Sequence, residues 1–419
     1  MFFNDLETAI TESFPFKNRV LLQTINRYIQ ERIGNYLVLT KKFYVENRYI
    51  DLHWRAIYRR HFSRTYYEHC DKFATRIHMF QGDVSEDDYL GYLVLRPLPI
   101  TKALSRIVLK PYSDFFCSNK TYLMTTRVNV SIISLNFYTA LDCFPTLVQD
   151  GVAQVCAESC MNMAGRYMSR KFPKDFPDYK PDKLFTEGID RRSIPSFGLS
   201  IYEISDIMQK AGYRAYIQKI RSKKEFFEYI DPQIESGLPV IFAYGEHVSV
   251  VAGHTFQENK KFYIVFDDSG YHLEKIGHKQ KPLFSGTLNL EKIRWETGVY
   301  GVFFDFDKVF LRPQIVTALS NKLNFGFDRK FIIEYKLLIK KLNEMGFSVD
   351  LINKRNPRYV WFLEGDYGAI IIDAASHIYD YYYSIIGIVN KWKKGAIGLL
   401  KPIQGGKKFD EEKKSRRME

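Results

Sequence analysis

Apolar positions in the first third of the chain follow both helical and strand-like spacings. Between Asn18 and Ile33 they recur every three or four residues, and Gly34 follows, which predicts a helix that ends at Gly34. The run Tyr92–Leu95 is continuously apolar and precedes Arg96-Pro97, as is typical of a buried strand that stops at a proline. Residues 1–140 therefore predict a small α+β domain, in which no catalytic signature is evident.

The central third has helical spacing first and strand-like runs afterwards. The predicted helices are Cys156–Met168, Ser200–Ala211 and Lys223–Glu235, and the predicted strands are Val240–Tyr244, Val248–Ala252 and Phe262–Phe266. Helices followed by a twisted antiparallel sheet are an α+β order, so residues 141–312 predict a second α+β domain.

The last third predicts a further α+β region over residues 313–404. An amphipathic helix is expected at Phe331–Met345, and strands are expected at Tyr359–Leu363 and Ala369–Ile372. Residues 405–419 are charged and nearly devoid of apolar side chains, which predicts a disordered tail.

Composition and charge narrow the class of protein. The chain has 419 residues, of which 46% are hydrophobic and 26% charged, values ordinary for a soluble globular protein. The most apolar late stretch, Ala369–Val389, contains Asp373, His377 and Asp380, so no membrane span is expected. The net charge of +13 permits contact with nucleic acid, but Lys and Arg are scattered, which favours a solvated basic surface.

The cysteines do not form a disulfide or zinc pattern. Their positions are Cys70, Cys117, Cys143, Cys156 and Cys160. Their number and irregular spacing predict reduced thiols in a cytoplasmic protein, with no metal and no cofactor.

One cysteine stands where a nucleophile is expected. The segment Gln149–Cys160 reads QDGVAQVCAESC, a loop of small residues that leads directly into a helical pattern. Cys156 therefore lies at or near the helix start, where the free N–H groups and the positive end of the dipole favour a thiolate and can bind an oxyanion. Cys160 lies one turn deeper and is expected to be structural.

A base and an orienting carboxylate follow at strand boundaries. His247 precedes one predicted strand, and Asp267 ends another. A hairpin between these strands, centred on residue 257 in the polar segment 254–260, would place His247 and Asp267 opposite each other with Cβ atoms about 5 Å apart. Such a carboxylate holds an imidazole in the tautomer that accepts a thiol proton. A register slip of one residue would substitute Asp268.

The rival histidines are expected in other places. His254 is the main alternative base, but this hairpin places it in the turn. His272 and His278 follow the Asp strand and are expected in loops.

The ordered set of Gln, Cys, His and Asp resembles papain-like cysteine peptidases, most closely the C39-type, bacteriocin-processing branch. In that branch a Gln precedes a Cys-x-x-x-Cys helix start, matched here by Cys156-Ala-Glu-Ser-Cys160. Gly198-Leu-Ser200 before a helix that ends in Ala211-Gly212-Tyr213 also matches, as does Ser236-Gly237-Leu-Pro239 before the His strand. The resemblance covers about residues 149–284. It gives no information on the residues before or after this range.

The resemblance implies a papain-like central domain in a bacterial-type peptidase, with a peptide or protein substrate. Cys156 would be the nucleophile, His247 the base, Asp267 the orienting group and Gln149 the oxyanion-hole glutamine. Gln149 lies seven residues before Cys156, where the family has six, and Gln154 lies two before it, so either can fill that role. Asp268 stands where the family commonly has Pro.

Two alternatives remain open at this point. One is a catalytically silent papain-like scaffold that binds a protein or a nucleic acid. The other is an acyltransferase of transglutaminase type, which shares the Cys-His-Asp order. The sequence gives no indication of the oligomeric state.

Overall fold

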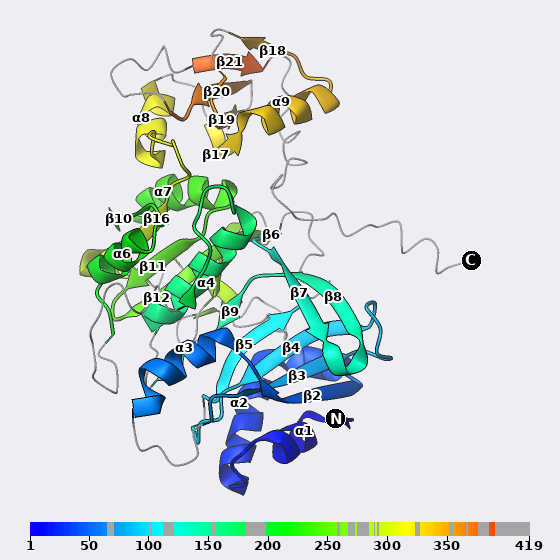
Figure 1. The fold of residues 1–419 in the computed structure, drawn as a ribbon. Coiled ribbons are helices and arrows are strands. Elements are labelled where there is room, and N and C mark those ends of the chain that lie inside the picture. Colours follow the sequence, from blue (N-terminus) through cyan, green and yellow to red (C-terminus); the bar gives the residue numbers. More distant parts are fainter. Residues whose placement is uncertain are drawn as a thin grey trace. The chain divides into compact units, whose positions relative to one another are not determined.

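The computed structural model describes residues 1–64, 71–100, 102–111, 121–151, 156–181, 198–257, 260–266, 273–274, 285–288, 290, 293–322, 327–351, 356–365, 368–375 and 385–389 (Figure 1). The chain divides into two compact units, Met1–Phe227 with Leu238–Asp307, and Glu228–Gly237 with Lys308–Glu419. Both contain helices and antiparallel sheets, which confirms the predicted α+β class. The boundaries predicted after residues 140, 312 and 404 remain predictions, and residues 405–419 lie outside the described part.

The first unit begins with a six-stranded antiparallel sheet. Its strand order is β1-β2-β3-β4-β5-β9. The strands are β1 (Phe2–Phe3), β2 (Lys42–Tyr49), β3 (Ala74–Phe80), β4 (Tyr89–Leu95), β5 (Leu104–Leu109) and β9 (Thr146–Leu147). The central strands β3, β4 and β5 are buried along their whole length, because both faces of the sheet are covered.

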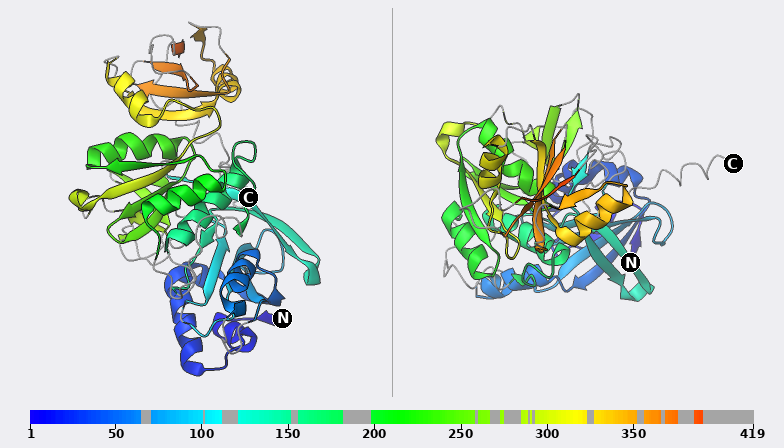
Figure 2. Two further views of the ribbon diagram at one scale, coloured as in Figure 1. Left: turned by 60° about the vertical axis from the view of Figure 1, so that its left-hand side comes forward. Right: turned by 90° about the horizontal axis from the view of Figure 1, so that it is seen from above.

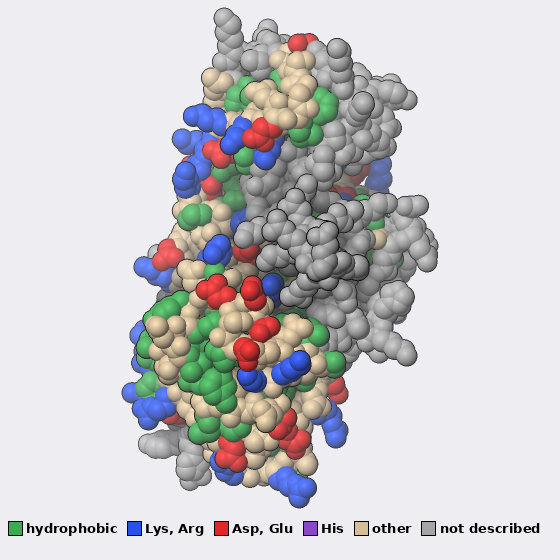
Figure 3. Space-filling model, turned by 90° about the vertical axis from the view of Figure 1, so that its right-hand side faces the viewer, with side chains coloured by type: hydrophobic (Ala, Val, Ile, Leu, Met, Phe, Trp, Pro, Cys, Tyr) green, Lys and Arg blue, Asp and Glu red, His purple; other side chains and the backbone are tan. Residues whose placement is uncertain are grey.

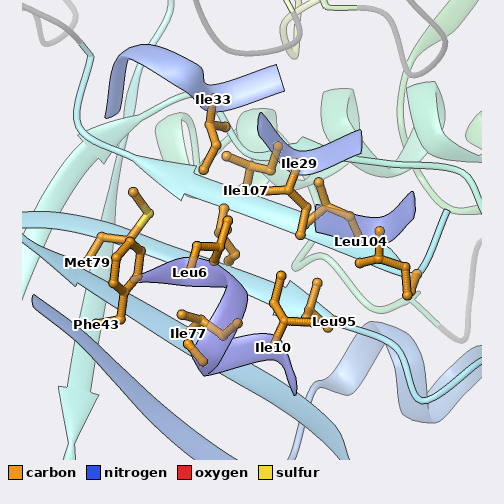
Figure 4. Close-up of a cluster of buried hydrophobic side chains, with 14 of the residues drawn as sticks. Leu6, Ile10, Ile29, Ile33, Phe43, Ile77, Met79, Leu95, Leu104 and Ile107 are labelled. Atoms are coloured by element: carbon orange, nitrogen blue, oxygen red, sulfur yellow. The ribbon is translucent and has the colours of Figure 1, made fainter. Parts of the chain in front are cut away.

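Helices α1 (Leu6–Ser13) and α2 (Arg19–Leu39) cover one face of this sheet. Figure 4 shows Leu6 and Ile10 of α1 over strand side chains such as Ile77. The predicted end at Gly34 coincides with a break in the helical geometry, but α2 does not stop there. The helix kinks at Ile33 (φ −127°, ψ 22°) and continues, because Tyr36 is buried in the same core.

The other face carries α3 (Leu52–Arg60) and a two-stranded ribbon, β7 (Thr126–Ile132) with β8 (Phe137–Cys143). Buried and exposed residues alternate strictly along β7, as expected of a strand with one face on a core. The short helical turns η1 (Phe62–Arg64) and η3 (Ile133–Leu135) follow α3 and β7. This core therefore joins chain segments that are more than 60 residues apart.

The second sheet of the first unit contains the predicted site. Its strand order is β10-β16-β11-β12-β13-β15-β14, and β6 pairs with β12. The strands are β6 (Tyr122–Leu123), β10 (Ala215–Ile220), β11 (Val240–Tyr244), β12 (His247–Gln257), β13 (Lys260–Phe266), β14 (Leu273–Glu274), β15 (Ser285–Leu288) and β16 (Val299–Phe304), with the turn η5 (Trp295–Thr297) before β16. The three strands predicted here are confirmed as parts of β11, β12 and β13.

Three helices accompany this sheet, and their predicted positions are confirmed. They are α4 (Cys156–Lys171), α6 (Ile201–Lys210) and α7 (Lys223–Glu235). Ser200 and Glu203 form a reciprocal capping box that fixes the start of α6. Figures 1 and 2 show α4 and α6 beside this sheet, and Phe226 near the start of α7 packs against Phe242 and Tyr263 of the sheet.

The second unit contains a five-stranded antiparallel sheet in the order β17-β19-β20-β21-β18. Its elements are α8 (Pro313–Lys322), β17 (Phe327–Glu334), α9 (Tyr335–Glu344), β18 (Val349–Leu351), β19 (Tyr359–Gly365), β20 (Ala369–Asp373) and β21 (Ile385–Val389). The helix predicted at Phe331–Met345 is wrong over its first four residues. Phe331, Ile332 and Ile333 pair with β19, and the side chains of Phe331 and Ile333 belong to the hydrophobic core on one face of the sheet.

Two surface properties bear on the sequence predictions. Among the described residues, no helix is both long enough and apolar enough to cross a membrane. On the face shown in Figure 3, Lys and Arg side chains lie among Asp and Glu side chains wherever residues are described.

Candidate active site

Cys156 is the first residue of α4, as the sequence predicted. The structure describes three cysteines, and Cys156 alone is partly exposed. Cys160 is fully buried one turn further on. Cys143 is also buried, and this burial raises the pKa of its thiol to about 12. Of the three, Cys156 is therefore the thiol that both meets solvent and lies at a helix N-terminus.

A hydrogen bond fixes α4 against β12. The Sγ of Cys160 donates to the carbonyl oxygen of Val248 over 3.4 Å. At the other end of the helix, the Nζ of Lys171 donates to the carbonyl oxygen of Thr125. The neighbouring Met124 N–H donates to Ala252 of β12.

These contacts set the direction of α4 along the sheet. The helix advances from residue 160 to 171 while its contacts on β12 advance from residue 248 to 252, so the two run the same way. Cys156 lies one turn before Cys160, about 6 Å along the helix axis. The start of α4 and the start of β12, Cys156 and His247, therefore lie at the same end of the sheet.

His247 begins β12 directly after a tight turn. It pairs with Tyr244 of β11, and Gly245 between them has φ +57°, a conformation that favours glycine. The rings of His247 and Tyr244 are 6.0 Å apart, and the ring of Tyr244 is 5.4 Å from that of Phe242. Phe242 in turn meets Phe226 of α7. The His247 side chain thus lies on the α7 face of the sheet.

The α4 face is formed by the alternate residues. Val250 pairs with Phe266, whose ring stacks on Phe144 at 4.3 Å, and Phe144 meets Tyr167 of α4 at 5.7 Å. Strand alternation therefore points Val248 and Val250 toward α4 and His247 away from it. For His247 to contact Cys156, its side chain has to reach past the end of β12 to the α4 face of the sheet.

The antiparallel hairpin predicted after His247 exists, but its predicted register is wrong. The prediction required Phe266 opposite Val248, whereas Phe266 pairs with Val250, and Gln257 pairs with Lys260. Both strands run further toward the turn than predicted, and β12 contains an irregularity between Val251 and Gly253. The candidate carboxylates Asp267 and Asp268 lie outside the described residues.

The alternative base His254 is not in a turn, contrary to the prediction. It lies within β12, is 5% exposed, and its ring meets that of Tyr122 at 5.7 Å. Its burial, seven residues beyond the start of β12, does not favour it as the base for Cys156. His272 and His278 lie outside the described residues.

Gln149 lies in the segment that leads from β9 toward α4 and is partly exposed. This segment is anchored by Arg96, a fully buried residue at the end of β4. Arg96 donates to the carbonyl oxygen of Val148 at 2.5 Å and to that of Leu104 at 3.1 Å. Asp150 beside Gln149 is buried and interacts with the charge of Arg96. Gln154, the other candidate for the oxyanion hole, lies outside the described residues.

The sequence analysis missed a buried charge cluster between the first sheet and α4. Arg106 of β5 forms an ion pair with Asp51, whose other carboxylate oxygen accepts the N–H of Trp54 at the start of α3. Burial alone would raise the pKa of Asp51, but the charge of Arg106 holds it below its usual value. Arg166 of α4 faces the same groups. In the sequence, Arg106 and Arg166 each stand within an apolar run. This is the one sign of the charge cluster in the sequence, and it does not reveal which residues the arginines meet.

No group of three or more His, Cys, Asp or Glu side chains suited to a metal ion occurs in the described part of the chain.

Comparison with known proteins gives a limited likeness. No protein-family model and no curated protein matches this sequence. Among solved structures, it is similar to UfSP from C. elegans, with a TM-score of 0.29 and 13% identity over 48% of this chain. The match spans 37% of that chain. At this level the likeness assigns neither a fold family nor an activity.

Proposed function

We propose that this protein is a cysteine peptidase that hydrolyses a peptide or isopeptide bond with Cys156 as its nucleophile. The observation that carries the proposal is the position of Cys156, partly exposed at the N-terminus of α4 and at the same end of the sheet as His247. The free N–H groups of the first helical turn are there available to an oxyanion. The affiliation with the C39-type branch and a cytoplasmic location belong to the same proposal.

In this mechanism His247 accepts the proton of the Cys156 thiol, and the sulfur attacks the carbonyl carbon of the substrate. The backbone N–H of Cys156 and the Gln149 amide stabilise the oxyanion. His247 then gives its proton to the leaving amine, and water hydrolyses the thioester. Asp267, or Asp268, orients the imidazole through a hydrogen bond.

The orientation of His247 imposes one requirement on this mechanism. Because its side chain starts from the α7 face, the ring has to turn past the end of β12 to reach the Sγ of Cys156. Gly245 and Glu246 form the turn between β11 and β12, and both are exposed. The hairpin of these two strands therefore does not cover the start of β12. A rotation of the His247 side chain is therefore part of the proposal.

The test is covalent labelling with a peptidyl acyloxymethyl ketone, which needs a nucleophile and a working base. We expect the adduct on Cys156, read by peptide mass, and its loss in His247→Ala. Cys143→Ala is the matched control, since that buried thiol should contribute nothing. An unlabelled Cys156 in a folded protein would contradict the proposal.

The orientation of His247 also supports a second candidate, a catalytically silent scaffold that binds a protein partner. In that case Cys156→Ala retains partner binding and no substrate is turned over. An acyltransferase of transglutaminase type is separated from a peptidase by adding an acceptor amine, which would be incorporated into the product.

A further inference from the structure

Arg166 of α4 forms no ion pair with any residue in the described part of the chain. Its Nε is shielded from solvent and donates to no acceptor among the described residues, and its guanidinium makes neither an ion pair nor a hydrogen bond there. Its guanidinium carbon lies 5.1 Å from the centre of the Tyr179 ring. As a residue Arg166 is partly exposed, whereas its neighbours Gly165 and Tyr167 are buried, so α4 meets solvent at this position.

The surroundings of Arg166 carry an excess of positive charge. Arg106 and Arg170 face it, and among the described residues Asp51 is the carboxylate that acts on its charge. Asp51 is already paired with Arg106. Burial and these two arginines lower the pKa of Arg166. The charged guanidinium is therefore unfavourable for the stability of the fold at this position.

The ring of Tyr179, which forms one side of this site, is held in place by hydrogen bonds. The hydroxyl of Tyr179 donates to the Oδ1 of Asn162, and the Nδ2 of Asn162 donates to the carbonyl oxygen of Glu158 at 2.6 Å. These bonds fix Tyr179 over the guanidinium of Arg166 and leave the fork of that group to a ligand. A guanidinium with free N–H groups binds a carboxylate in a bidentate manner.

We propose that Arg166 and Arg170 bind the carboxylate of an acidic side chain in a peptide substrate. Arg170 lies one turn beyond Arg166 on the same helix, is exposed, and makes no ion pair in the described part of the chain. The identity of the ligand as a substrate rests on the proposed function. The site itself rests on the unpaired arginines.

The position on α4 sets where the acidic residue lies in the substrate. Arg166 is ten residues after Cys156, about 15 Å along the helix. An extended peptide covers that distance in about four or five residues. Because residues 157–165 of α4 are buried, a substrate does not lie directly on the helix between these two points, and its Asp or Glu is expected at least that many residues from the scissile bond.

Binding is tested on the Cys156→Ala chain, so that it is measured without turnover. The probes are fluorescein-labelled ten-residue peptides of Gly, Ser and Leu that contain two Glu or two Gln, followed by anisotropy. We expect the Glu peptide to bind roughly tenfold more tightly at low salt, as for a charge-assisted hydrogen bond. Arg166→Gln with Arg170→Gln should abolish this preference, and Arg19→Gln on the distant helix α2 should preserve it.

Three outcomes would overturn the inference: equal affinity for the two peptides, a preference that survives Arg166→Gln with Arg170→Gln, or saturation by inorganic phosphate alone, which would make this a phosphate site. The Tm of each variant shows whether the replaced chain is still folded. Because Arg166 forms no ion pair within the described part of the chain, its replacement should leave the Tm equal or higher. Glu preference without any cleavage by the wild-type chain would leave the site intact and contradict the proposed function.

Discussion

The Sγ of Cys160 lies 3.4 Å from the carbonyl oxygen of Val248, and this contact decides where the start of α4 lies on the sheet. It joins residues 88 positions apart in the sequence. Because Cys160 is fully buried, helix and strand approach closely at this point. The location of Cys156 near the start of β12 depends on it.

Replacing Cys160 with Ala should therefore lower the free energy of unfolding by about 1–2 kcal/mol, through the lost hydrogen bond and a small cavity. Cys160→Ser keeps a donor for the Val248 oxygen and should cost less. Urea unfolding of the two variants measures the difference. If the Ala variant were the more stable of the two, the contact would not stabilise the position of α4.

The buried pair of Asp51 and Arg106 predicts a large effect of charge alone. Asp51→Asn keeps the oxygen that caps α3 but leaves Arg106 buried without its counter-charge, which costs about 3–5 kcal/mol. Asp5 caps α1 in the same way at an exposed site, so Asp5→Asn should change stability by less than about 0.5 kcal/mol. Similar losses for the two variants in urea unfolding would show that capping, not charge, is what matters at Asp51.

His78 in β3 predicts loss of stability in mild acid. Its ring nitrogens contact Tyr89 at 2.7 Å and Glu46 at 2.8 Å, and burial lowers its pKa to about 4. The unfolded chain binds a proton near pH 6.5 that the folded chain refuses, so stability falls as the pH drops from about 6.5 toward 4. The loss between pH 7 and pH 5 is about 2 kcal/mol for this group.

The measurement is the Tm of the wild type and of His78→Gln from pH 7 to pH 5. The variant should lose less Tm over this range, because glutamine does not titrate. His53 is also buried with a lowered pKa and supplies part of the remaining slope in both proteins. Parallel curves for the two proteins would contradict the assignment to His78.

The sequence predicted local elements well and long-range geometry poorly. Helices α4, α6 and α7 and strand β11 follow from periodicity and from caps such as Ser200, which act within a few residues. The hairpin register failed because the longer strands and the irregularity in β12 are properties of pairing that an alternating pattern does not encode. Phe331 was assigned to a helix because its apolar neighbours fit that period, whereas β19 pairs with it.

For the candidate site, too, the sequence predicted the local features but not those that depend on the tertiary fold. The position of Cys156 at a helix start is a local property and was predicted from the sequence. The face on which His247 lies depends on the tight turn at Gly245 and on the contact of Phe242 with α7. The ionic neighbours of Arg166 come from α3, β5 and α4, which only the tertiary fold brings together.

The most direct test of the central claim is the pH dependence of iodoacetamide labelling at Cys156, read by peptide mass in the wild type and in His247→Ala. A thiolate paired with an imidazolium should react well below about pH 8 and should lose this advantage in the variant. The buried thiols Cys143 and Cys160 give the internal reference. A Cys156 that reacts only near about pH 8.5, the range of an ordinary thiol, with or without His247, would contradict the peptidase account and favour the silent scaffold.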